Sequence, residues 1–109
     1  MNPRPHKYGA VACERDGHHF PSLLEGRLYD ELVLQREHGD VLFFLRQVPF
    51  HLPGGGVARI DFQVAYRDGR IRWIDAKGKE TAEWKRIIRI VEQLYPVRIE
   101  TWPKPRKPR

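Results

Sequence analysis

Hydrophobic residues recur along the first part of this chain at the spacing of a helix. Leucines repeat every four residues from Leu24 to Leu32, which predicts a helix over about 22–38. Ser22 and Glu25 have the spacing of a capping box at its start, and a glycine directly after the segment favours a left-handed stop.

A second, stronger helical pattern occupies the C-terminal third. Apolar residues lie 0, 3, 4, 7, 10 and 11 positions along from Trp84, ending at Tyr95. Thr81 is suited to cap this segment and Pro96 to end it, so the pattern predicts an amphipathic helix.

Strands are predicted between and after the two helices. The nearly continuous apolar run 41–48 predicts a mostly buried strand, and Pro49 places its later part at an edge or a bend. Residues 58–66 alternate apolar and polar, and 71–77 and 97–102 predict two further strands. The order helix, three strands, helix, strand predicts an α/β fold.

Composition limits the class of protein. The chain has 109 residues, 40% of them hydrophobic, which suits one domain with one modest core. Its apolar runs are too short to span a bilayer, so we expect no membrane association. The single cysteine, Cys13, excludes an intramolecular disulfide framework and favours a reducing, cytoplasmic setting.

The positive charge is concentrated at the two ends. The net charge of +6 equals the charge on residues 1–7, a basic flexible N-terminal arm, together with residues 103–109, a basic Pro-rich tail that we expect to be mobile. Residues 8–102, the expected single domain, are formally neutral. Basic arms favour a polyanionic partner, nucleic acid first, although a purely solubilising role stays open.

Two carboxylates and a lysine in adjacent strands suggest phosphodiester chemistry. Asp61 lies in one strand, and Asp75-Ala76-Lys77 closes the next. The carboxylates, with the Ala76 carbonyl, are the hard oxygen ligands that Mg²⁺ or Mn²⁺ prefers. Lys77 points to the same side as Asp75 and can orient a water or stabilise charge on a phosphate.

The turn between these strands decides whether the two carboxylates meet. A two-residue turn at Asp68-Gly69 would place Asp61 and Asp75 on opposite faces. A three-residue loop, 67–69, with glycine in the left-handed position places them directly across from each other. The metal-site hypothesis therefore predicts the three-residue loop.

Simpler roles remain open for each residue. Asp61 could pair with Arg59 or Arg72, Asp75 could cap the loop before the second helix, and Lys77 could be ordinary surface charge.

Two further polar residues are ambiguous. The capping box alone explains Glu25, yet a first-turn carboxylate could also be directed towards the metal. Gln47 could contact phosphate or be a satisfied amide at the sheet edge. Cys13, His18 and His19 lack an evident fourth zinc ligand, and the loop 52–56 lacks the Gly-Lys-Ser/Thr ending of a phosphate-binding loop, so we expect no nucleotide cofactor.

In this order and at these spacings, Glu25, Asp61 and Asp75-Ala76-Lys77 resemble the PD-(D/E)XK nuclease superfamily over residues 16–102. The stretch around Gln47 adds a likeness to a small phage-encoded branch near the Holliday junction resolvases, including archaeal-type ones. The resemblance implies a restriction-endonuclease-like αβββαβ core with a mixed central sheet flanked by helices. It also implies a homodimer that hydrolyses DNA with Mg²⁺ or Mn²⁺, in the host cytoplasm if phage-encoded.

The resemblance also implies roles for individual residues. Asp61 and Asp75 would be metal ligands, Lys77 the catalytic lysine, and Glu25 the residue that completes the site. The chain departs from the motif at Ile60, which replaces the eponymous proline, and at Asp75, which replaces the commoner glutamate.

Gln47 and eight basic residues are expected to contact DNA phosphates. The expected contacts are Gln47, Lys79, Lys85, Arg86, Arg89, Lys104, Arg106, Lys107 and Arg109. We therefore expect a metal-dependent, structure-selective endonuclease acting on branched DNA, most specifically on Holliday junctions. The alternatives are a nicking or restriction-like endonuclease on duplex DNA, and a non-catalytic basic nucleic-acid-binding adaptor.

Overall fold

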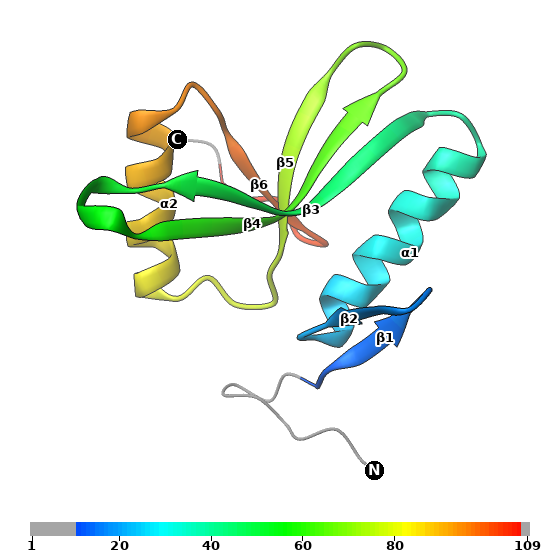
Figure 1. The fold of residues 1–109 in the computed structure, drawn as a ribbon, viewed down its shortest axis with the longest axis horizontal. Helices are drawn as coiled ribbons and strands as arrows, with labels where there is room; N and C mark the ends of the chain where they lie inside the picture. Colours follow the sequence, from blue (N-terminus) through cyan, green and yellow to red (C-terminus); the bar gives the residue numbers. More distant parts are fainter. Residues whose placement is uncertain (1–10, 108–109) are drawn as a thin grey trace.

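The structure is a computed structural model that describes residues 11–107 (Figure 1). The N-terminal arm 1–7 and Arg109 lie outside the described residues. The elements in order are β1 (Cys13–Arg15), β2 (His18–Phe20), α1 (Leu23–Glu37), β3 (Val41–His51), the short 3-10 helix η2 (Pro53–Gly55), β4 (Val57–Tyr66), β5 (Ile71–Ala76), α2 (Ala82–Leu94) and β6 (Ile99–Trp102).

From α1 onward the chain follows the predicted order of helix, three strands, helix and strand. The strands that follow α1 form one four-stranded sheet in the order β3-β4-β5-β6. β3, β4 and β5 pair antiparallel, and β6 runs parallel to β5 after the crossover through α2, so the sheet is mixed. The predicted α/β class is confirmed at this level. The short β1–β2 hairpin was not predicted.

The helix ends follow the local sequence. Ser22 Oγ accepts a hydrogen bond from the Glu25 N–H at 3.1 Å, and Thr81 Oγ1 accepts one from the Trp84 N–H at 3.1 Å, so both predicted N-caps are confirmed. After α1 the backbone at Gly39 is left-handed, with φ +89°. The N–H groups of Gly39 and Asp40 satisfy carbonyls of the last helical turn, a Schellman motif.

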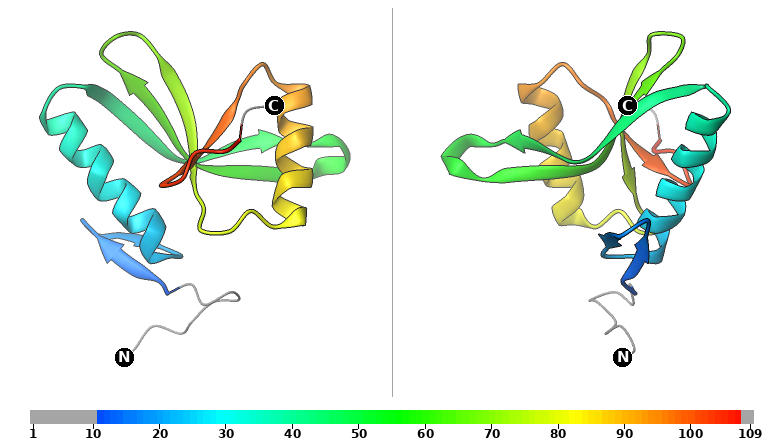
Figure 2. Two further views of the ribbon diagram at one scale, coloured as in Figure 1. Left: turned by 180° about the vertical axis from the view of Figure 1, so that it is seen from behind. Right: turned by 45° about the vertical axis from the view of Figure 1, so that its right-hand side comes forward.

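The sheet lies between the two helices, and its strands cross at a strong twist (Figures 1 and 2). Because of this twist, one strand contributes to two hydrophobic cores. Phe62 packs into the core beside α1, with Leu28 and Leu32. Ile60, two residues earlier on β4, packs into the core beside α2, with Ile88 and Val91. Asp61 therefore lies at the position on β4 where the strand passes from one core to the other.

The prediction that β3 is mostly buried is wrong. Leu42, Phe43 and Leu45 remain 59%, 50% and 50% exposed. β3 lies at the edge of the sheet and, among the strands of residues 11–107, is paired with β4, while α1 packs against one of its faces. A continuous apolar run can therefore serve an edge strand as well as a central one.

Residues 103–107, the described part of the C-terminal segment, pack against the domain. The mobile tail expected for 103–109 is not seen in these residues. Arg106 forms an ion pair with Glu92 of α2 at 2.8 Å and donates to the Ile99 carbonyl. The side chains of Thr101 and Arg98 donate to the carbonyls of Lys104 and Lys107. Four contacts, made with α2, β6 and Arg98, thus hold residues 103–107 against the domain.

Within residues 11–107, no helix has the length and apolar character needed to cross a membrane.

Candidate active site

The turn between β4 and β5 is the three-residue loop that the metal-site hypothesis required. The Tyr66 N–H donates to the Arg70 carbonyl at 2.9 Å, and Gly69 is left-handed with φ +93°. The ladder runs from Ala65 opposite Ile71 to Phe62 opposite Ile74. One step further along this register, Asp61 faces Asp75.

The two aspartates are joined through the backbones of both strands. The Asp61 N–H donates to Asp75 Oδ1 at 2.8 Å, and the Ala76 N–H donates to Asp61 Oδ2 at 2.9 Å. The regular ladder between β4 and β5 ends at the pair of Phe62 and Ile74. Beyond this pair, the two carboxylates accept hydrogen bonds from backbone N–H groups in place of backbone carbonyls. Side-chain bonds to backbone N–H groups fix both carboxylates at this point.

Glu25 lies at the same place from the side of α1. Its side chain is only 3% exposed, and Gln47 Nε2 donates to Glu25 Oε1 at 2.9 Å and to Asp61 Oδ1 at 3.3 Å. The Glu25 carboxylate is therefore directed to the centre of the sheet. Gln47, whose backbone is left-handed with φ +53°, links α1 to β4.

Burial makes the three carboxylates hold protons more tightly than they do in water. The pKa of Asp61 is raised to about 8, chiefly by burial and then by the charges of Asp75 and Glu25. Burial also raises the pKa of Asp75 and of Glu25. Lys77 opposes these shifts at all three groups, so its ammonium lies within electrostatic range of the whole cluster.

Lys77 follows β5 and is anchored by its backbone. Its N–H donates to the Trp102 carbonyl of β6 at 3.0 Å, and its Nζ lies 5.7 Å from the centroid of the Trp84 ring. The structure therefore brings together all four residues predicted as catalytic: Glu25, Asp61, Asp75 and Lys77.

Sequence reasoning missed two residues of this cluster. Trp84, interpreted only as an apolar helix position, donates from Nε1 to Asp75 Oδ2 at 2.8 Å. Arg46 stacks on Phe20 with its guanidinium carbon 4.0 Å from the ring centroid, and its Nη2 lies 3.9 Å from Glu25 Oε1. The available signal for Trp84 was chemical, since a buried indole N–H needs an acceptor.

The contacts of Asp61 and Asp75 differ from the simpler structural roles considered for them, an ion pair and a cap. Among residues 11–107, Asp61 forms no ion pair with Arg59 or Arg72, and Arg72 instead binds both oxygens of Glu100 at 2.8 Å. The cap of α2 is Thr81, not Asp75.

The donor set suits a hard cation, although the side chains are hydrogen-bonded to one another. In the described part of the chain, no three His, Cys, Asp or Glu side chains are already arranged as a ligand group. Asp61 and Asp75 are nevertheless adjacent, buried and mutually repelling, and each carboxylate oxygen has lone pairs beyond its one hydrogen bond. The Gln47 amide donates to both Glu25 and Asp61, so its nitrogen occupies a position that those two carboxylates share.

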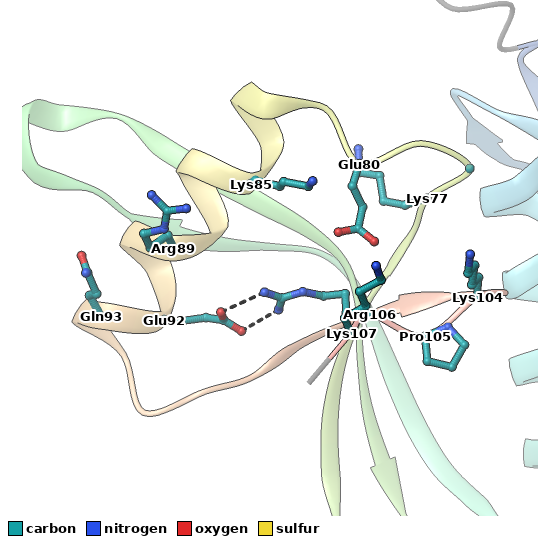
Figure 3. A pocket seen from close by; sticks show the side chains of 11 residues that line it. Lys77, Glu80, Lys85, Arg89, Glu92, Gln93, Lys104, Pro105, Arg106 and Lys107 are labelled. Carbon is teal, nitrogen blue, oxygen red and sulfur yellow. Dashed lines mark hydrogen bonds and ion pairs between the residues drawn. The ribbon is translucent and has the colours of Figure 1, made fainter. Parts of the chain in front are cut away.

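The predicted phosphate contacts divide into two groups. A groove of about 620 Å³ is lined by five of them, Lys85, Arg89, Lys104, Arg106 and Lys107, together with the predicted catalytic residue Lys77 (Figure 3). Arg86 points elsewhere and pairs with Glu83 at 2.8 Å. Lys79 is exposed outside the groove lining, and Gln47 belongs to the carboxylate cluster.

The fold and the site thus define a mixed α/β protein with buried carboxylates, a lysine and an adjoining basic groove. Residues 5–104 match the family model described as "Protein of unknown function (DUF1064)", and the chain belongs to that family. No curated protein and no solved structure matches the chain significantly.

Proposed function

We propose that this protein is a metal-dependent endonuclease that hydrolyses phosphodiester bonds in DNA. The observation that carries the proposal is the β4–β5 register, which sets Asp61 beside Asp75 with Lys77 in range. A purely structural hairpin has no need for two buried carboxylates at the point where its strands part.

In this proposal Asp61 and Asp75, with the Ala76 carbonyl, hold Mg²⁺ or Mn²⁺, and Glu25 joins them when Gln47 releases it. A divalent ion held by these residues would supply the positive charge that polarises the phosphate and makes an attacking water more acidic. Hydrolysis forms a bond between the water oxygen and phosphorus, breaks one phosphorus–ester bond, and transfers the water proton towards the leaving oxygen. Lys77 stabilises the extra negative charge on the phosphate oxygens and orients the attacking water.

Trp84 and the backbone of β4 have positioning roles. The Trp84 indole holds one oxygen of Asp75, and the Asp61 N–H holds the other. These bonds leave the carboxylate few orientations, so the site is pre-organised for charge that develops on the phosphate.

The substrate we propose is branched DNA, with Holliday junctions most specific and resolved by a homodimer. The basis for this choice is the resemblance to junction resolvases, together with the need for two equivalent cuts, which a twofold axis supplies. A nicking or restriction-like activity on duplex DNA is the alternative within the same chemistry.

The test uses a labelled four-way junction, a duplex of the same sequence and a single strand, each with Mg²⁺, Mn²⁺ or EDTA. We expect symmetric junction cuts that require metal and disappear in Asp75→Asn. Cleavage of duplex and junction at equal rates would support the nuclease proposal but contradict the preference for junctions. Binding of DNA without metal-dependent cleavage would overturn the enzyme.

That last result would favour a non-catalytic nucleic-acid-binding adaptor. The observation on its side is that every carboxylate in the cluster already accepts a hydrogen bond from the protein.

A further inference from the structure

The groove beside α2 is built from two parts of the chain that are distant in sequence. Lys85 and Arg89 project from α2 on one side, and Lys104 and Lys107 come from the segment after β6 on the other (Figure 3). Lys77 lies at one end, two residues after Asp75. Glu25, Asp61 and Asp75 do not line the groove themselves, and Lys77 is the residue that connects it to the carboxylate cluster.

The lining carries a net positive charge. Six of its eleven residues are Lys or Arg and two are Glu. One of these acids, Glu92, is held by Arg106 at 2.8 Å in a pair whose side chains are 4% and 17% exposed. Within residues 11–107, the five other cations of the lining form no ion pair. Their charge is available to an external anion.

The C-terminal wall is fixed in place. Besides the Arg106–Glu92 pair, the carbonyls of Lys104 and Lys107 accept bonds from Thr101 and Arg98. The Arg106 guanidinium also lies 5.6 Å from the centroid of Trp84, which holds Asp75. The same side chains therefore connect the wall of the groove to the carboxylate cluster.

We propose that this groove binds the sugar–phosphate backbone of one DNA strand, next to the phosphate at Asp61 and Asp75. The inference rests on the proposed nuclease and adds the path of its substrate. Cations at both walls match a chain of phosphates better than a single small anion. Contacts of this kind position the strand without reading its sequence, as a structure-selective enzyme requires.

The test measures binding of the full chain to a labelled duplex and single strand by fluorescence anisotropy in EDTA, over a series of salt concentrations. One pair of substitutions, Lys85→Gln with Arg89→Gln, alters the helix wall. A second, Lys104→Gln with Lys107→Gln, alters the C-terminal wall. The matched control, Arg27→Gln with Arg67→Gln, removes the same charge from exposed sites outside the groove lining.

We expect each groove pair to weaken binding about 10-fold near 0.1 M salt. The log–log salt slope should fall by about 1.8 for duplex and about 1.4 for a single strand, which corresponds to two lost phosphate contacts. The control pair should change affinity less than about 2-fold. Poly-glutamate at equal charge should displace the DNA far less well than unlabelled DNA does.

Three results would overturn the proposal that the groove binds DNA. They are equal effects of groove and control pairs, absence of DNA binding by the unaltered protein, and equal displacement by poly-glutamate. The nuclease proposal fails independently of the groove proposal. If the groove variants bind DNA more weakly than the control but the unaltered protein does not cleave DNA, the groove proposal stands and the nuclease proposal fails. If the protein cleaves DNA and the groove variants bind it as tightly as the control variant, the nuclease proposal stands and the groove proposal fails.

Discussion

Asp61 and Asp75 face each other across β4 and β5, and the N–H of Asp61 donates to the carboxylate of Asp75 at 2.8 Å. This pairing depends on one extra residue in the turn at 67–69, because a shorter turn would send the two side chains to opposite faces. It also brings two carboxyl groups together at the point where β4 passes from one hydrophobic core to the other.

Replacing either aspartate should abolish cleavage while leaving DNA bound. In Asp61→Asn and Asp75→Asn the amide keeps the size of the side chain and loses the charge that holds a cation. Since loss of a residue that merely orients a ligand costs about 10–100-fold, we expect a loss beyond about 100-fold. Single-turnover cleavage of a four-way junction, beside the anisotropy of the same DNA, measures both properties. Full activity in either variant would contradict the metal site.

Stability without metal should fall as the pH rises. The folded state holds a proton on Asp61 up to about pH 8, whereas the unfolded chain releases it near the ordinary pKa of about 4. Between these values the folded state binds more protons, so the free energy of unfolding decreases with pH, by at most about 1.4 kcal/mol per unit for one proton.

Thermal unfolding in EDTA from pH 5 to 9 measures this dependence. Asp61→Asn should flatten it, and Mg²⁺ should raise Tm more at pH 8 than at pH 5, because the ion competes with the proton for the cluster. A Tm that is independent of pH in the unaltered protein would contradict the buried, protonated carboxylate.

Trp84→Phe tests the positioning of Asp75. The substitution keeps an aromatic ring beside Lys77 and Arg106 and removes the indole donor to Asp75. We expect kcat to fall about 10–100-fold and the metal concentration needed for half-maximal activity to rise.

The control for this variant is Trp73→Phe. Trp73 lies on β5, the strand that carries Asp75, and donates to Gln63 at 3.1 Å, so the substitution loses the same kind of hydrogen bond without touching a carboxylate. Equal effects of the two variants on the metal requirement would show that Trp84 acts through stability alone.

Removing the amide of Gln47 should destabilise the metal-free protein. In Gln47→Leu, the carboxylates of Glu25 and Asp61 lose the donor that they share. We expect a loss of about 1–3 kcal/mol in the free energy of unfolding in EDTA, and partial recovery with Mg²⁺, which takes the place of the lost donor. Urea unfolding with and without the ion measures both. Gln35→Leu, which removes a helix-surface bond to Glu31, is the control and should be nearly neutral.

The contact between α1 and β1 should be sensitive to a single methyl group. A Cβ at Gly26 would lie 2.6 Å from the Cys13 sulfur, so Gly26→Ala forces the hairpin or the helix to move. We expect a destabilisation of about 1–3 kcal/mol, measured by urea unfolding. Adding Cys13→Ala removes the obstructing sulfur and should recover part of it. An unchanged double variant would place the cost elsewhere.

Local signals predicted most of the fold. The two helices were predicted from leucine and isoleucine spacing and from the caps Ser22 and Thr81, because these are features of neighbouring residues. The turn at 67–69 followed from a chemical requirement on Asp61 and Asp75, and the structure has it. The strands of β1 and β2 were missed because three residues are too few to show an alternating period.

The missed parts of the site depend on contacts that are distant in sequence. Arg106 meets Glu92 fourteen positions away, so a basic, Pro-rich tail could not be distinguished from a docked one. The exposure of β3 depends on its place at the sheet edge, which an apolar run does not reveal. Trp84 fits an amphipathic helix whether or not its N–H bonds to a carboxylate.

The parallel pairing of β6 with β5 has a consequence for how the protein folds. β6 is separated from β5 by the whole of α2, so this contact closes a long loop and is slow compared with the β4–β5 hairpin. Yet the N–H of Lys77 has its acceptor at Trp102, and the groove has its second wall only after β6 is in place. The hairpin can thus bring the aspartates together early, while the lysine and the groove are completed by the last strand to join the sheet.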